Sequence, residues 1–272
     1  MTSANPSSKW SDLAPRVLSA VVMAGIAIAA VALGNPVFLI MISVVIGLCV
    51  GEFGRILHPV PPRIFVLLGG LAAIAMFLAG QRFDMTTSSA SLIAPTTLLL
   101  LLPPLLGAGL IKQHKLLFFG YCSLIMLAGL GFVVMGPEEI LIWFLLIIIM
   151  SDVAGYFIGR MVGGPKFWPR VSPKKTWSGT IAGWVGALLI GLIAAGFGVF
   201  TLAEAMFAPL IAFAGQMGDI AESAIKRKMG IKDSSNLIPG HGGVLDRFDA
   251  MIGAAAVLVL LMGVASLMTS AG

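Results

Sequence analysis

The chain has 272 residues, of which 58% are hydrophobic and only 11% are charged, and its formal net charge at pH 7 is +5. Soluble domains carry about 25% charged residues, so this chain has too few charges to cover a water-soluble fold, and its mean hydropathy of +1.03 favours lipid as the solvent. The composition argues against a soluble domain and predicts an all-α, polytopic bundle of transmembrane helices.

Apolar stretches long enough to span a bilayer recur along the whole chain. A spanning helix needs roughly 20 mostly apolar residues, and nine stretches meet or nearly meet this length. The nine stretches are 15–33, 37–57, 64–80, 91–111, 116–135, 139–158, 178–199, 204–227 and 248–270. A polar tail, residues 1–12, precedes the first stretch, which lacks a typical cleavage site and is expected to be a retained helix.

The loop charges predict an orientation. With nine spans, one side of the membrane receives 16 of the 17 Lys and Arg residues, and the other side receives only Arg82. The positive-inside rule then places the N-terminus in the cytoplasm, the C-terminus outside, and the loops 159–177 and 228–247 on the cytoplasmic side. Topology explains the positive charge, so we predict no nucleic-acid partner.

Charged residues are concentrated in the second half of the chain. Residues 151–176 and 215–249 together hold 16 of the 29 charged side chains. We therefore predict N-terminal scaffold helices in residues 1–136 and a catalytic region in residues 137–272. The two cysteines, which lie in apolar runs, are expected to be buried free thiols.

The loop 159–177 contains five basic residues and no acidic residue. Pro173 and Ser178 predict a turn followed by the N-cap of the seventh helix, and the start of a helix favours anions. The loop therefore fits either a polyphosphate or a surface of anionic lipid. Asp152, in the preceding stretch, either reaches the same cavity or is a satisfied polar residue between helices.

The eighth stretch carries polar residues at helical spacing. Gly215, Asp219, Glu222, Ser223 and Lys226 share one face of a helix. Polar groups inside a span are costly and usually face a cavity or one another. The stripe indicates a functional site, and the alternative is a structural ion pair between Lys226 and one of the two acids. The basic residues 226–228 also fit topology anchors at the inner end of a span.

The segment after this stretch has the composition of a phosphate site. Gly240, Gly242 and Gly243 permit a loop that turns backbone N–H groups toward an anion. Asp246 and Asp249 share a face if a helix has begun there, and carboxylates together with phosphate oxygens are the usual ligands of Mg²⁺. The sequence has no zinc-type His or Cys cluster, Walker-type loop or serine-hydrolase elbow.

These segments carry a family resemblance. Residues 223–249, SAIKRKMGIKDSSNLIPGHGGVLDRFD, resemble the signature of the phosphatidate cytidylyltransferases, also called CDP-diglyceride synthetases. Residues 172–177, SPKKTW, resemble a second motif of that family, and Asp152 with Tyr156 and Gly159 is similar to a third. The family commonly has an acidic residue after this second motif, where this chain has Ser178.

The resemblance implies that the chain transfers CMP from CTP to phosphatidic acid, giving CDP-diacylglycerol and pyrophosphate. It implies Mg²⁺ as cofactor, as one ion or two, and a multi-pass protein of a bacterial cytoplasmic (inner) membrane with its active site facing the cytoplasm. The catalytic residues would be Asp219, Lys226 and Asp246, and the metal ligands Asp219, Asp246 and Asp249. Substrates would be bound by Ser172, Lys174, Lys175, Thr176, Ser223, Arg227, Lys232, His241, Gly242, Gly243 and Arg247. The glycine-rich helix faces would also suit a homodimer in the lipid bilayer.

Two other functions fit parts of the pattern. Another CTP-dependent membrane enzyme, such as a polyprenol or phytol kinase, would share the nucleotide and differ in the acceptor. An ion-coupled transporter would use Asp152, Asp219 and Glu222 as its ion path, but the chain shows no pair of repeated halves.

Overall fold

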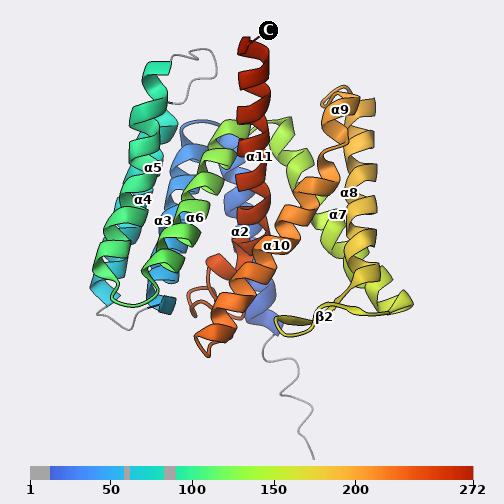
Figure 1. Cartoon of the computed structure of the whole chain (residues 1–272), viewed down its shortest axis with the longest axis horizontal. Coiled ribbons are helices and arrows are strands. Elements are labelled where there is room, and N and C mark those ends of the chain that lie inside the picture. The colour runs from blue at the N-terminus through green and yellow to red at the C-terminus, as the bar shows by residue number, and fades with distance from the viewer. Residues whose placement is uncertain (1–12, 58–61, 83–89, 272) are drawn as a thin grey trace, which may run out of the picture.

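The computed structural model describes residues 13–57, 62–82 and 90–271 of the chain, and the predicted polar tail lies outside them. In this part the chain is a bundle of long helices with one small hairpin at its lower end (Figure 1). The helices are α2 (Leu13–Leu33), α3 (Val37–Leu57), α4 (Pro62–Arg82), α5 (Ala90–Leu110), α6 (Lys115–Met135), α7 (Glu139–Val162), α8 (Trp177–Gly196), α9 (Leu202–Ala205), α10 (Ala208–Lys228) and α11 (Leu245–Ala271).

Each of the nine predicted stretches corresponds to a long helix in the described residues. Six of these helices, α2, α3, α4, α6, α7 and α8, are long and apolar enough to cross a membrane. Helix α5 contributes a shorter apolar segment, Ala94–Leu110, whereas α10 and α11 carry the charged residues of the predicted site. The chain therefore has the helices of a multi-pass membrane protein, and the total of nine crossings stays a prediction.

The sequence predicts one helix for the eighth stretch, from residue 204 onward, but the structure has two. Residues 204 and 205 belong to the short α9, which begins with a capping box in which the side chains of Thr201 and Glu204 accept from each other's backbone N–H groups. Helix α10 begins only at Ala208, with Pro209 in its first turn, a position where the missing N–H of proline costs no hydrogen bond.

Most of the predicted loop 159–177 is helix or strand. Helix α7 continues to Val162, and the rest forms an antiparallel hairpin of β1 (Lys166–Trp168) and β2 (Ser172–Thr176). This hairpin is a small addition to a bundle that is otherwise helical, as the predicted all-α class requires. The predicted N-cap is also wrong, because Thr176 accepts the N–H of Gly179 at 3.2 Å and so caps α8. Ser178 lies inside the first turn and donates to the Gly163 carbonyl.

Apolar side chains from both predicted regions form one continuous core, which includes Phe53, Phe118 and Ile252. Cys49 and Cys122 are buried in it as free thiols, as predicted. Helix α11 packs against both α6 and α10, so it joins the two parts of the bundle. The predicted division between residues 136 and 137 stays a prediction.

Glycines allow the helices that carry the site to touch at their backbones. A Cβ atom on Gly218 of α10 would overlap the carbonyl oxygen of Asp249 on α11, and one on Gly253 would overlap that of Ala214. Such close crossings are typical of helices that pack in lipid. The contact brings Asp249 beside residue 218, the neighbour of Asp219.

Candidate active site

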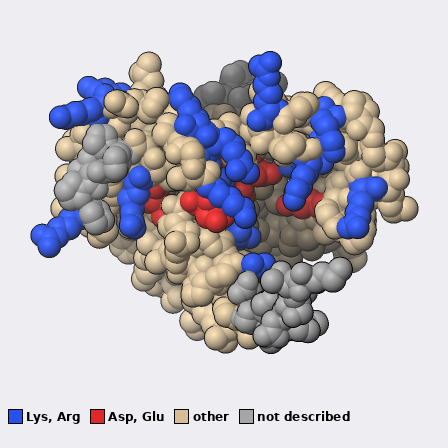
Figure 2. Space-filling model, turned by 90° about the horizontal axis from the view of Figure 1, so that it is seen from below, with Lys and Arg blue, Asp and Glu red and all other residues tan. Residues whose placement is uncertain are grey.

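Charged residues gather at the lower end of the bundle, where the hairpin and the connection 229–244 lie. Seen from below, Lys and Arg side chains surround a smaller number of Asp and Glu side chains (Figure 2). Two groups of polar residues are found there: a pocket beside the hairpin and a buried network between α3, α10 and α11.

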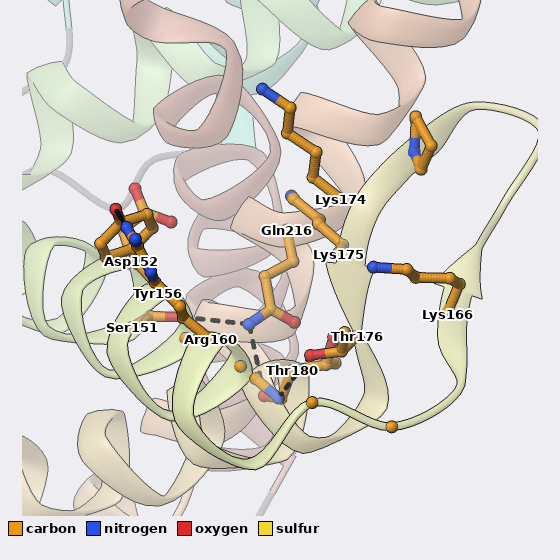
Figure 3. Close-up of a pocket in the computed structure, with 16 residues that line it drawn as sticks. Ser151, Asp152, Tyr156, Arg160, Lys166, Lys174, Lys175, Thr176, Thr180 and Gln216 are labelled. Atoms are coloured by element: carbon orange, nitrogen blue, oxygen red, sulfur yellow. Dashed lines mark hydrogen bonds between the residues drawn. The ribbon is translucent and has the colours of Figure 1, made fainter.

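The pocket has a volume of about 620 Å³ and is lined by α7, α8, the hairpin and one residue of α10 (Figure 3). Its basic lining residues are Arg160, Lys166, Lys174 and Lys175. Asp152 is the acidic residue among the described lining, so it does reach the cavity of the basic loop. The excess of positive charge makes this pocket suited to an anion with several charges.

Gln216 forms the inner wall of the pocket, although the sequence did not single it out. Its Nε2 atom donates to Ser151 Oγ at 3.2 Å and to the Thr180 carbonyl at 3.4 Å. Its Oε1 atom accepts the indole N–H of Trp184 at 3.0 Å. Gly183 leaves the space for this amide, since a Cβ there would lie 2.7 Å from Gln216 Nε2. Gln216 therefore ties α7, α8 and α10 together behind the cations.

Asp219 connects the hairpin to α10. Its Oδ2 atom lies 2.5 Å from Lys175 Nζ, and its Oδ1 atom accepts from Ser223 Oγ at 3.4 Å. The Asp219 side chain is 34% exposed, so it remains accessible to solvent. The structure thus brings together residues from two motifs that the sequence places 44 positions apart, at 175 and 219.

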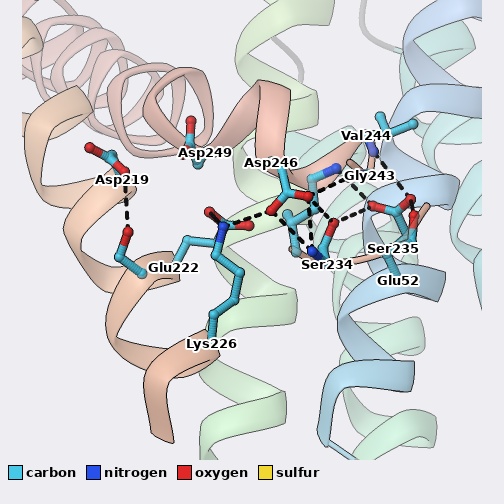
Figure 4. A network of polar contacts seen from close by, with 12 residues as sticks. Glu52, Asp219, Glu222, Lys226, Ser234, Ser235, Gly243, Val244, Asp246 and Asp249 are labelled. Atoms are coloured by element: carbon cyan, nitrogen blue, oxygen red, sulfur yellow. Dashed lines mark hydrogen bonds and ion pairs between the residues drawn. The ribbon is translucent and has the colours of Figure 1, made fainter. Parts of the chain in front are cut away.

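Lys226 lies between two buried carboxylates (Figure 4). Its Nζ atom is 2.8 Å from Glu222 Oε2 and 2.6 Å from Asp246 Oδ1. The lysine side chain is 12% exposed, whereas those of Glu222 and Asp246 are 1% and 4% exposed. The alternative of a structural ion pair between Lys226 and Glu222 is therefore present, and Asp246 adds a second carboxylate to it.

Asp246 is held by several donors from the chain itself. The backbone N–H of Ser234 lies 3.1 Å from Oδ1 and 2.9 Å from Oδ2, and the hydroxyl of Ser234 and the N–H of Gly243 also reach Oδ2, at 2.9 and 2.7 Å. With Lys226 on Oδ1, both carboxylate oxygens are occupied. Two N–H groups of the connection 229–244 are therefore turned toward a carboxylate of the chain.

Glu52, on α3, is a member of this network that sequence reasoning missed. Its two oxygens accept hydrogen bonds from the hydroxyls of Ser234 and Ser235 and from the N–H groups of Val244 and Leu245, at 2.6 to 3.1 Å. The residue is 4% exposed. The one signal in the sequence was a lone acid near the end of an apolar stretch.

The glycine-rich loop forms a tight turn beside α2. The N–H of Ile238 donates to the carbonyl of Gly242 at 2.8 Å, and Gly240 and Gly242 have φ values of +74° and +84°. His241 Nδ1 lies 2.7 Å from Ser19 Oγ, on the first described helix. The expected turn is present, and its predicted contact with CTP stays a prediction.

The remaining predicted substrate residues are spread around these two groups. Arg227, Lys232 and Arg247 are exposed, and Ser172 is partly buried at the start of β2. Their positions at the same end of the bundle leave them available to an anion, but they do not join the buried network.

Of the three predicted magnesium ligands, Asp219 and Asp249 have the carboxylates that are better placed to bind the ion. Asp219 is partly exposed, Asp249 is partly buried, and the crossing of α10 and α11 brings their backbones together. Asp246 would first have to give up hydrogen bonds from the chain. Within the described residues, no group of three or more His, Cys, Asp or Glu side chains forms a metal cage. Mg²⁺ is usually held by one or two carboxylates plus substrate phosphates, so Asp219 and Asp249 fit this ion.

A protein family matches nearly the whole chain. The model of a family described as the cytidylyltransferase family matches residues 14–265. The chain belongs to this family.

Individual proteins are also similar in sequence to this chain, over shorter stretches than the family model. The chain is 50% identical over 117 residues to a protein of Brucella suis named phosphatidate cytidylyltransferase, covering 40% of this chain and 42% of the relative. Proteins of the same name from Staphylococcus saprophyticus and Helicobacter pylori are 36% identical over 143 residues and 42% identical over 125 residues. These two matches cover 49% and 44% of this chain and 55% and 46% of the relatives. The chain thus matches about half the length of these relatives.

Substitution of Gly243 by alanine is expected to disrupt the buried network. The added methyl group would overlap Ser234 Oγ and Glu52 Oε2, and overpacking of this kind costs about 1–3 kcal/mol. We expect a lower melting temperature of Gly243→Ala in detergent. Gly120→Ala on α6 is the control, because a Cβ there has no neighbour within 4 Å. Equal melting temperatures of the two variants would contradict the tight packing at residue 243.

Proposed function

We propose that the chain is a phosphatidate cytidylyltransferase, which transfers CMP from CTP to phosphatidic acid. The observation that carries the proposal is the ion pair between Lys175 and Asp219, which joins the pocket of cations to the acidic helix pair α10 and α11. Two anionic substrates that must react with each other need such a combination of cations and metal-binding carboxylates. The names of the relatives support the choice of substrates.

In the proposed reaction, a phosphate oxygen of phosphatidic acid forms a bond with the α-phosphorus of CTP, and the bond from that phosphorus to the bridging oxygen of pyrophosphate breaks. The second pKa of a phosphate monoester is about 6, so the attacking oxygen is largely ionised at pH 7 and needs no general base. The chain must therefore offset the repulsion between the substrates and the charge on the leaving pyrophosphate.

The basic lining of the pocket, with Lys174 and Lys175, would bind phosphate groups. Arg227, Lys232 and Arg247 lie exposed at the same end of the bundle and would add to the attraction. Asp219 and Asp249 would hold Mg²⁺, which when bound neutralises phosphate charge. Lys226, enclosed by Glu222 and Asp246, would keep these two carboxylates in place.

The proposal includes a location in the bacterial cytoplasmic membrane with the site on the cytoplasmic side. The pocket and the network lie at one end of the bundle, the end where the Lys and Arg residues gather (Figure 2). The positive-inside rule assigns such an end to the cytoplasm, which is where CTP is found. The proposal also includes a homodimer, in which the exposed faces of the helices would contact a second copy of the chain.

The function is tested by the turnover of the purified protein in detergent micelles. Reactions with CTP would contain phosphatidic acid, a polyprenol or no lipid, each with Mg²⁺ or with EDTA. We expect pyrophosphate release and CDP-diacylglycerol with phosphatidic acid, and at least a hundredfold loss when EDTA removes the metal. Release of CDP with the polyprenol would show that the chain is a kinase. If the folded protein does not turn over CTP with phosphatidic acid or with the polyprenol, the proposal that the chain is an enzyme is overturned.

A further inference from the structure

Glu52 stands at the start of α11 although it belongs to α3. Each of its oxygens accepts one backbone N–H and one serine hydroxyl: Oε1 from Val244 and Ser235, and Oε2 from Leu245 and Ser234. The first N–H groups of a helix have no partner within that helix. A carboxylate from a distant helix therefore caps α11 and uses the favourable charge at its N-terminus.

The same carboxylate is connected to Asp246 through one hydroxyl. Ser234 Oγ lies 3.0 Å from Glu52 Oε2 and 2.9 Å from Asp246 Oδ2. A serine hydroxyl has a single hydrogen, so the two carboxylates share it. Asp246 in turn forms an ion pair with Lys226. A displacement of Glu52 would thus pass through Ser234 to the ion pair of α10 and α11.

We propose that Glu52 is a positioning residue of the active site. It fixes the connection 229–244 and the first turn of α11, so that Asp246 faces Lys226 and Asp249 lies beside α10. This role rests on the proposed function, because it acts on the residues that the reaction would use. The N-terminal helices would then contribute to the chemistry and not only to the membrane anchor.

Glu52→Gln is a sharp test because of the donors around the carboxylate. An amide has one acceptor oxygen and one donor nitrogen, so in either orientation its NH₂ group faces the N–H of Val244 or Leu245. We expect peptides that contain these two residues to exchange their amide hydrogens at least about tenfold faster, and kcat per folded molecule to fall about 10- to 100-fold, as for a small misplacement of reacting groups.

Two serine variants and one glutamate variant complete the experiment. Ser235→Ala removes one bond from Glu52 and none from Asp246, whereas Ser234→Ala removes the shared hydroxyl, so we expect kcat to fall more in the second. Both keep the test open if Glu52→Gln does not fold. Glu139→Gln, an exposed acid in the first turn of α7, is the matched control and is expected to behave as the wild type.

The outcomes separate this inference from the proposed function. Unchanged exchange of residues 244 and 245 in folded Glu52→Gln would overturn the capping role. Faster exchange with an unchanged kcat would overturn the positioning role, because the contact would then serve stability alone. Absence of turnover in the wild type would overturn the proposed function, and the positioning role of Glu52 with it, whereas the exchange data would still report whether Glu52 caps α11.

Discussion

Asp219→Asn is expected to lower the turnover number about 100- to 1,000-fold while the protein remains folded. Asp219 is 34% exposed and its ion pair is with Lys175, so the loss of one charge at this position costs at most about 1 kcal/mol of stability. The expected loss of activity is larger because Asp219 is proposed to hold the metal next to the reacting phosphates, where its charge would act on the transition state. Pyrophosphate release, measured over a range of Mg²⁺ concentrations, checks this prediction.

Two further variants show how Asp219 acts. Asp233→Asn, an exposed acid in the connection 229–244, is the control and should keep its activity. Lys175→Met removes the same ion pair and leaves the carboxylate in place. Because Lys175 is also proposed to bind phosphate, an inactive Lys175→Met variant would show that this lysine is required and would not separate its ion pair from its contact with the substrate. If Asp219→Asn keeps more than a tenth of the wild-type rate, Asp219 does not bind a catalytic metal.

Asp246→Asn should differ from Asp219→Asn in one measurable respect. Its NH₂ group would face Lys226 or the N–H of Gly243, since both carboxylate oxygens accept from donors. We therefore expect a lower melting temperature in addition to the loss of turnover. A variant with unchanged melting temperature and no activity would assign Asp246 to the metal and not to the network.

Lys226→Met is expected to destabilise the protein by about 3–5 kcal/mol, since it leaves two buried carboxylates without a counter-charge. Glu222 and Asp246 are 1% and 4% exposed in their side chains, so water does not replace the ammonium group. Thermal unfolding in detergent micelles measures the effect. The double variant Lys226→Met with Glu222→Gln should recover part of the loss, because one of the stranded charges is removed.

The control for this prediction lies on the same helix end. Lys228 is exposed, and Lys228→Met should change the stability by no more than about 0.5 kcal/mol. A single variant Lys226→Met that unfolds at the wild-type temperature would show that Glu222 and Asp246 are neutral or hydrated in the folded protein.

Features that depend on neighbouring residues were predicted well from the sequence. The apolar length of each stretch is a local property, so each of the nine helices was found within a few residues. The stripe on α10 was also predicted, because spacing along one helix places Glu222 and Lys226 together. The sequence left open whether Asp152 reaches the cavity of the basic loop or is a satisfied polar residue between helices, and the structure places it in the same lining as Lys174 and Lys175.

Features that depend on distant contacts were not predicted. The role of Glu52 arises from donors 182 to 193 positions further along the chain, and an acid near the end of an apolar stretch is typical of a membrane interface. The hairpin has strands of three and five residues, too short for an alternating pattern. The N-cap of α8 is Thr176 and not the predicted Ser178, because β2 extends to residue 176 and the extended backbone there suits a cap.

The hydrogen bonds of Glu52 join parts of the chain that are synthesised at different times. A chain is made from its N-terminus, so α3 enters the bilayer while residues 234 to 245 have not yet been synthesised. Until they arrive, the carboxylate of Glu52 lacks the four donors that it has in the folded protein. Contacts of such long sequence separation form late in folding. The end of the bundle that holds the pocket and the buried network is therefore completed last.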